Sequence, residues 1–140
     1  MINVNYFAIV ASTVVSMVLG ALWYGPLFGK KWLAFSGITE EVKNKAKAKG
    51  MSKSFGLMFL GAFLMNYVLA HAIVFANAYL ETEGVASGLV GGFWNWLGFI
   101  APVTMGVVLW EGKSWGLWLI NSGYYLVALS VAGIILNIWP

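Results

Sequence analysis

The sequence predicts an all-α membrane protein in which four transmembrane helices form an antiparallel bundle. Two observations lead to this fold class. Apolar residues make up 61% of the 140-residue chain and charged residues only 9%, whereas soluble domains contain about 45–50% and about 25%. The few charges also divide the chain into four charge-free stretches, residues 1–29, 54–80, 84–110 and 114–140. A soluble domain of this size could not bury so much apolar surface, so we expect the bilayer to be its solvent.

Each charge-free stretch is long enough to cross a bilayer as one helix. The last three contain 27 residues each, which is about 40 Å of helix against about 30 Å of hydrocarbon. They are too evenly apolar for the alternating strands of a barrel. We expect spans at about 4–25, 54–80, 85–110 and 114–138, within a single domain of residues 1–140. The first stretch has no basic segment and no cleavage pattern before Trp23, so we expect it to be retained rather than removed as a signal peptide.

The lysines are concentrated in the loop between the first two spans. This loop, residues 26–53, contains seven of the eight lysines, whereas the second loop contains only Glu81 and Glu83 as charged residues. The positive-inside rule therefore predicts that the 26–53 loop and the third loop, 111–113, are cytoplasmic and that both termini lie outside. We expect a multi-pass protein of the cytoplasmic membrane.

The lysine-rich loop has readable local structure. Pro26 follows Gly25 and should end the first helix near the interface. Thr39 is a predicted N-cap with Glu40 and Glu41 in the first turn after it, which indicates a short polar helix over 40–49. Its lysines have two interpretations, a solvated face that sets the topology or attraction to anionic lipid. Because the chain has no arginine, we expect no nucleic-acid partner.

Small residues at four-residue spacing predict where helices approach each other closely. The first span contains Ala8, Ser12, Ser16 and Gly20, and the third begins with Gly84, Gly88 and Gly92. Such stripes allow close backbone approach in a membrane. We interpret them as intramolecular packing faces, with a dimer face as the alternative. Pro102 should kink the third span.

Polar residues inside the spans are the candidate functional residues, because polar groups are costly at that depth. Counting from the helix ends puts Asn66 and Asn95 near the midplane. Four-residue spacing puts Tyr67 with His71, and Asn121 with Tyr125, on shared helix faces. A polar seam through the bundle is therefore possible, as hydrogen bonding between helices or as a path for a substrate or ion. The seam consists of Asn66, Tyr67, His71, Asn95, Asn121 and Tyr125.

The residues that chemistry requires are scarce. The chain has no cysteine, one histidine and no carboxylate within a span, so we expect no metal site, no cofactor and no enzymatic activity. The best remaining pair, Ser122 and His71, is predicted to lie in opposite halves of the membrane. Two hypotheses remain: an accessory subunit of a larger membrane complex, or a homo-oligomeric transporter or channel for a small neutral or weakly basic solute.

Several motifs resemble one known family. The interfacial signature, with Trp23, Tyr24, Gly25, Pro26 and Trp32, is similar to the opening of a bacterial four-helix membrane family described as domain of unknown function 1761. The motifs of the second half agree with it: Trp96-Leu97-Gly98-Phe99, Ala101-Pro102, Glu111-Gly112-Lys113 and Asn121-Ser122-Gly123-Tyr124-Tyr125-Leu126-Val127. The resemblance implies the four-helix fold and a bacterial inner membrane, but no activity. It also implies a histidine where this sequence has Tyr125, which counts against a proton relay there.

Overall fold

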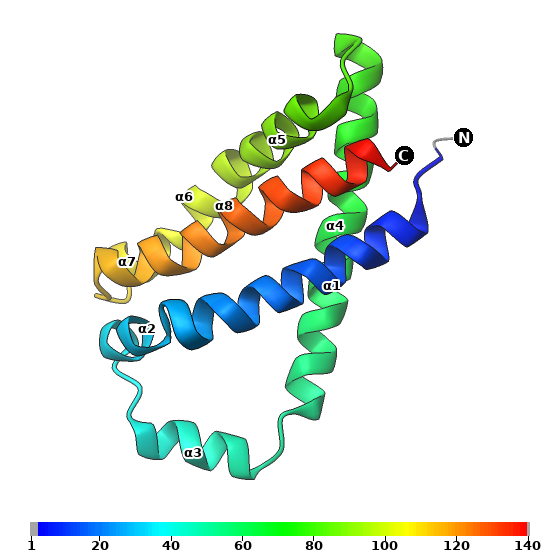
Figure 1. The fold of residues 1–140 in the computed structure, drawn as a ribbon. Helices are drawn as coiled ribbons and strands as arrows, with labels where there is room; N and C mark the ends of the chain where they lie inside the picture. Colours follow the sequence, from blue (N-terminus) through cyan, green and yellow to red (C-terminus); the bar gives the residue numbers. More distant parts are fainter. Residues whose placement is uncertain (1–2, 140) are drawn as a thin grey trace.

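The computed structural model describes residues 3–139, which contain helices and no strands (Figure 1). Four of the helical stretches are long and apolar enough to cross a membrane, as judged by length and composition. They are Tyr6–Leu27, Ser52–Leu80, Gly84–Leu109 and Trp115–Ile138. The predicted all-α class with four apolar helices of spanning length is confirmed.

The four stretches differ in regularity. Two of them are single helices, α4 (Ser52–Leu80) and α8 (Trp115–Ile138). The first combines α1 (Tyr6–Leu22) with a π-helical segment, η1 (Trp23–Leu27), and is followed by α2 (Gly29–Ser36) and α3 (Glu40–Ala48). The third is broken into α5 (Gly84–Asn95), a second π-helical segment η2 (Trp96–Ile100), α6 (Ala101–Thr104) and α7 (Gly106–Leu109). The backbone irregularities are therefore confined to two of the four stretches.

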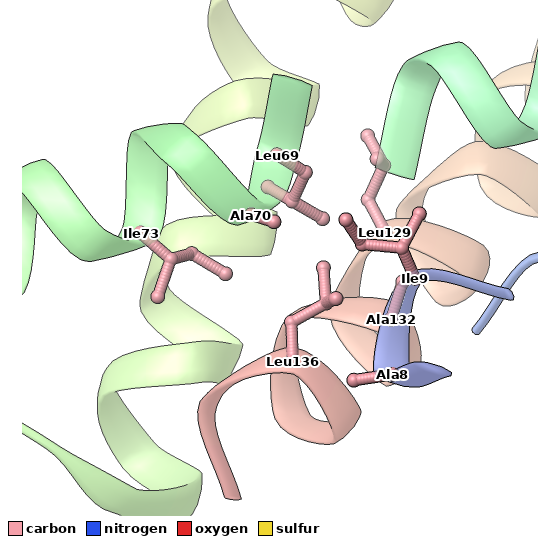
Figure 2. Close-up of a cluster of buried hydrophobic side chains, with 8 residues drawn as sticks. All are labelled: Ala8, Ile9, Leu69, Ala70, Ile73, Leu129, Ala132 and Leu136. Carbon is pink, nitrogen blue, oxygen red and sulfur yellow. The ribbon is translucent and has the colours of Figure 1, made fainter. Parts of the chain in front are cut away.

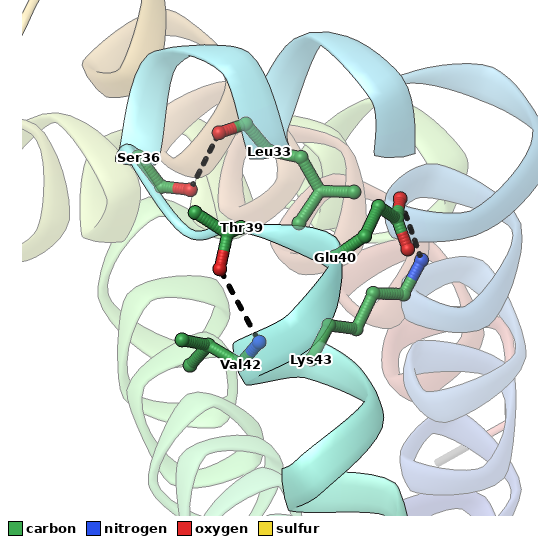
Figure 3. A network of polar contacts seen from close by, with 6 residues as sticks. All are labelled: Leu33, Ser36, Thr39, Glu40, Val42 and Lys43. Carbon is green, nitrogen blue, oxygen red and sulfur yellow. Dashed lines mark hydrogen bonds and ion pairs between the residues drawn. The ribbon is translucent and has the colours of Figure 1, made fainter.

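Side chains at the helix starts explain where three of these helices begin. The side-chain oxygens of Asn5, Thr39 and Ser114 accept hydrogen bonds from backbone N–H groups in the first turns of α1, α3 and α8. These bonds satisfy donors that have no partner within the helix. Figure 3 shows the Thr39 cap, at 3.3 Å from the Val42 nitrogen, next to the Glu40–Lys43 ion pair at 3.9 Å. The N-cap predicted at Thr39 is confirmed.

Both breaks in the helices fall near a proline. At the first, Gly25 leaves helical geometry with φ −101° and ψ −105°, directly before Pro26. At the second, η2 directly precedes the turn that contains Pro102. There the Thr104 hydroxyl donates to the Ile100 carbonyl at 2.7 Å. Proline lacks the N–H that a continuous helix would need, and the hydroxyl of Thr104 satisfies one of the carbonyls beside the break.

The two closest helices are α5 and α8, which run side by side in Figure 1 while α4 crosses at a steep angle. A buried apolar cluster joins α1, α4 and α8 where they meet (Figure 2). The cluster consists of Ala8, Ile9, Leu69, Ala70, Ile73, Leu129, Ala132 and Leu136. Most of α4 before this crossing has no neighbouring helix, as its first residues are all exposed.

The connections fall at two ends of the molecule. One end, which we call the lysine end because the lysine-rich loop lies there, contains α2, α3 and the turn from α7 to α8. There the Lys113 amine donates to the Ser36 carbonyl at 3.1 Å. At the termini end lie the start of α1, the turn from α4 to α5 and the end of α8, where Val4 and Trp139 line one small cavity. Four successive crossings of the molecule give this arrangement.

Candidate functional site

The predicted polar seam is divided among separate places. Asn66 is completely buried where α4 meets α1, and its amide nitrogen donates to the Thr13 hydroxyl at 3.3 Å. That hydroxyl donates in turn to the Ile9 carbonyl at 2.7 Å. The side-chain oxygen of Asn66 has no hydrogen-bond partner among residues 3–139. Asn66 therefore joins two helices and does not open onto a passage that the structure describes.

Tyr67 and His71 share one face of α4, as predicted from their spacing. Their ring centroids are 4.5 Å apart, and Nδ1 of His71 lies 2.8 Å from the Tyr67 carbonyl oxygen. The Tyr6 ring of α1 lies 6.3 Å from the Tyr67 ring. This pair is part of an aromatic contact between α1 and α4. Ser122 instead bonds to the Trp96 indole, and no hydrogen bond joins Ser122 to His71 in the described chain.

Asn121 and Tyr125, the two seam residues of α8, lie next to the interfacial signature. The Tyr24 hydroxyl donates to the side-chain oxygen of Asn121 at 3.0 Å. The ring of Tyr24 lies 5.5 Å from that of Tyr124, which in turn lies 5.0 Å from Tyr125. The Tyr124 hydroxyl reaches α1, where it donates to the Ser16 carbonyl at 2.8 Å. Residues that the sequence assigned to two different features thus form one contact region.

Both π-helical segments begin with a tryptophan that bonds to α8. The Trp23 indole donates to the Ile120 carbonyl at 2.9 Å, and the Trp96 indole donates to the Ser122 carbonyl at 2.8 Å and to its hydroxyl at 3.1 Å. An indole N–H within a membrane needs such a partner. We call Trp23, Tyr24, Trp96 and Tyr124 the aromatic collar. The polar side-chain atoms of the first three bond to residues 120–122 of α8, and the hydroxyl of Tyr124, which lies on α8, bonds to α1.

The other residues of the interfacial signature shape the chain beside the collar. Trp32 meets the Tyr24 ring edge-on at 5.9 Å. Gly25 provides the non-helical turn, and Pro26 is exposed next to it. π-helical turns are rare and often accompany functional sites. Here each of them contains a tryptophan that bonds to α8, so both broken helices are joined to that helix.

Asn95, another seam residue, borders a sizeable cavity. This cavity, about 410 Å³, is a groove between the second half of α4 and α5. Asn95 lies at its inner end, where the amide nitrogen donates to the Gly91 carbonyl at 2.9 Å. Ile73, Ala76 and Trp94 contribute to its apolar walls. The volume lies within the range of small-molecule sites.

A polar network at the mouth of this groove was not predicted. The Asn77 amide donates to the side-chain oxygen of Asn137, and its own oxygen accepts from the hydroxyls of Ser87 and Thr82. Asn137 donates in turn to the Gly84 carbonyl. The network joins the end of α4, the start of α5 and the end of α8. The sequence contains one sign of this network: Asn77 and Asn137 both lie near the carboxyl ends of their stretches, the second and the fourth. Whether the two side chains meet depends on how the helices cross.

The small-residue stripes lie at different kinds of contact. In α1, Ala8, Ser12 and Ser16 are buried, and Gly20 lies under the Tyr124 ring. The hydroxyls of Ser12 and Ser16 donate to the carbonyls of Ile9 and Ser12 within α1. These serines therefore allow close approach without leaving a polar group unpaired. In α5 the stripe meets α8 over only part of its length.

Two glycines of α5 lie directly against the backbone of α8. A Cβ atom on Gly88 would overlap the Gly133 carbonyl, and one on Gly92 would lie 2.7 Å from the carbonyl carbon of Leu129. Gly84 differs, since a Cβ atom there would meet nothing within 4 Å. Its φ of +87° suits it to the turn before α5 instead. The predicted packing stripe is therefore two residues long at this contact.

Metal-binding clusters are absent from the described part of the chain. No three histidine, cysteine, aspartate or glutamate side chains among residues 3–139 lie close enough together to hold a metal ion. The ion pairs of α3, Glu40 with Lys43 and Glu41 with Lys45, lie on an exposed helix.

Comparison with known proteins places the chain in a family. The model of the family described as "Protein of unknown function (DUF1761)" matches residues 7–137. No curated protein matches the chain, and no solved structure does. The match covers all but the first and last residues of the four stretches of spanning length, and the whole aromatic collar. The resemblance seen in the sequence motifs is thereby confirmed, and the chain belongs to the DUF1761 family of proteins of unknown function.

Proposed function

We propose that the protein is an accessory subunit of a larger membrane complex and that a transmembrane helix of a companion protein packs against the free segment of α4, residues 52–61. The observation that supports this proposal is that every residue of the free segment is exposed. A helix that only faces lipid on one side would still have a covered side. The free segment has no covered side, because the other helices meet α4 only beyond it.

The glycines of the free segment favour a protein partner over lipid alone. Glycine within a helix is less favourable than alanine by about 1 kcal/mol. At Gly88 and Gly92 the close contact with α8 offsets this cost. Gly56 and Gly61 lie in the free segment, and a Cβ atom on either would meet nothing within 4 Å. A companion helix would supply the close contact that these two positions lack.

The proposed orientation places the lysine end in the cytoplasm and both termini outside, in the bacterial inner membrane. It rests on the lysines, because Lys45, Lys47 and Lys49 are exposed on and directly after α3, and lysines concentrate on the cytoplasmic side of membrane proteins. The same lysines would attract anionic lipid at about 1 kcal/mol each when close to the surface. The proposed role involves no catalysis and no cofactor.

A homo-oligomeric transporter or channel for a small neutral or weakly basic solute is the second candidate. It is favoured by the groove, whose inner end carries the amide of Asn95. Counted along α5 from Gly84, Asn95 lies about 17 Å into the membrane, close to its middle. One chain provides only this open groove, so a second copy would have to close it.

Photocrosslinking in the source cell tests the proposal. A photoreactive phenylalanine analogue replaces Met58 of the free segment, which is 56% exposed. The matched control carries it at Phe99, which is 72% exposed on η2. We expect one companion protein to be captured at position 58 and not at position 99. An adduct of twice the mass of the chain at position 58 would support the homo-oligomer, and equal labelling at both positions would refute a docking role for the free segment.

A further inference from the structure

The groove between α4 and α5 has an apolar interior and a polar, acidic mouth. Apolar side chains, including Ile73, Ala76 and Trp94, line its length. At the mouth lie Thr82, Glu83 and Ser87, at the turn that joins the two helices. A site with this division suits a molecule that has a hydrocarbon chain and a polar head, because each part meets a matching environment.

The charge at the mouth selects the head group. Glu81 and Glu83 are the only charged side chains in the turn between α4 and α5, whereas all eight lysines lie between residues 30 and 53 or at 113, at the lysine end. Neither glutamate forms an ion pair with a lysine in the described chain. A carboxylate without a lysine partner at a membrane surface attracts a cation and repels an anionic head.

The neighbouring polar groups complete a head-group site. The hydroxyls of Thr82 and Ser87 are held by Asn77, which is itself bonded to Asn137 of α8. Thr82 and Ser87 belong to the lining of the groove together with Glu83. Oxygen acceptors around one carboxylate are suited to the three donors of a primary ammonium group.

We propose that the groove binds an amphiphile with a primary amine head and a single hydrocarbon chain, with the amine at Glu83 and the chain along α4 and α5 toward Asn95. The cavity of about 410 Å³ is open on one side, so the chain can enter from the lipid. The site is separate from the free segment of α4, which lies at the other end of that helix.

The turn itself offers a matched pair of variants. Glu83 lines the groove and Glu81 does not, although they are two residues apart and carry the same charge. Glu83 forms no side-chain cap on α5, so Glu83→Gln should leave the helix start intact. Glu81→Gln makes the same change in charge outside the groove. Ala76→Phe provides a third variant, because it fills the apolar part of the groove.

Binding is measured by native mass spectrometry of the protein in a neutral maltoside detergent. The probes are dodecylamine, dodecanol and dodecanoate. We expect dodecylamine to bind at least about tenfold more tightly than dodecanol, and dodecanoate to bind least. Glu83→Gln should remove the preference for the amine, Glu81→Gln should keep it, and Ala76→Phe should reduce binding of both uncharged and cationic chains.

Three results would overturn the proposal. Equal binding of all three probes would show that the mouth does not select an amine. An equal loss in Glu81→Gln and Glu83→Gln would indicate general surface charge rather than a site. Unchanged binding in Ala76→Phe would place the chain outside the groove.

Discussion

The contact of α5 with α8 and the free segment of α4 both contain pairs of glycines, but they are opposite in packing. Gly88 and Gly92 lie against the backbone of α8, so closely that no side chain fits between. By contrast, a Cβ atom on Gly56 or Gly61 would meet nothing within 4 Å. The comparison shows that a small residue in a membrane helix allows close approach without creating it. A second helix must be present at the right angle, and the exposed first turns of α4 come before its crossing with the other helices (Figure 1).

The largest expected effect comes from closing the contact between α5 and α8. Gly92→Ala places a methyl group 2.7 Å from the Leu129 carbonyl carbon, which is part of a backbone and cannot rotate away. We expect the free energy of unfolding to fall by about 2–3 kcal/mol. Denaturant unfolding in detergent, followed by circular dichroism, measures it. Gly98→Ala on the same stretch is the control, because a Cβ atom there meets nothing within 4 Å. Similar losses in both variants would contradict the role of close packing.

A moderate effect is expected from the aromatic collar. Trp96→Phe keeps a ring but removes the indole N–H that donates to the Ser122 carbonyl and hydroxyl. We expect a loss of about 1 kcal/mol in the free energy of unfolding, as for one hydrogen bond between membrane helices. Trp110→Phe should have no measurable effect, because Trp110 is 86% exposed. If the two variants were equally stable, the collar would contribute to shape and not to stability.

No loss of stability is expected in the free segment, which makes it the sharpest test of the comparison. Gly61→Leu adds a side chain in open space and removes a glycine from a helix interior, so the free energy of unfolding should not fall and should rise by up to about 1 kcal/mol. The same variant should no longer retain a companion protein during gentle extraction into nanodiscs. Phe99→Leu, an exposed substitution elsewhere, should retain it. Loss of stability in Gly61→Leu would mean that this segment is packed within the single chain after all.

Local features were predictable because they depend on neighbours in the sequence. Thr39 and Ser114 cap the helices that follow them, and the chain leaves helical geometry beside Pro26. The break expected from Pro102 is present, since the irregular segment Trp96–Ile100 directly precedes the turn that contains this proline. A π-helical turn needs an extra residue in the helix, and the sequence contains no simple signal for where that residue is inserted.

The polar seam shows the limit of counting along helices. Asn66 and Asn95 were predicted at similar depth, yet Asn66 is sealed against Thr13 while Asn95 borders the groove. Depth was estimated for each helix separately, whereas contact depends on crossing angle and rotation. The steep crossing of α4 brings Asn66 to α1 and opens the groove beside Asn95. For the same reason the pairing of Tyr24 with Asn121 was not expected.

By itself the sequence determined the all-α class, the four apolar helices and the family, because length, hydrophobicity and short motifs are properties of continuous segments. Only the tertiary structure decided which glycines lie in contacts, which tryptophans bond to α8 and where the groove lies. These features depend on how separate helices cross. In a membrane that crossing is set by side-chain packing and a few hydrogen bonds and not by a difference in hydrophobicity.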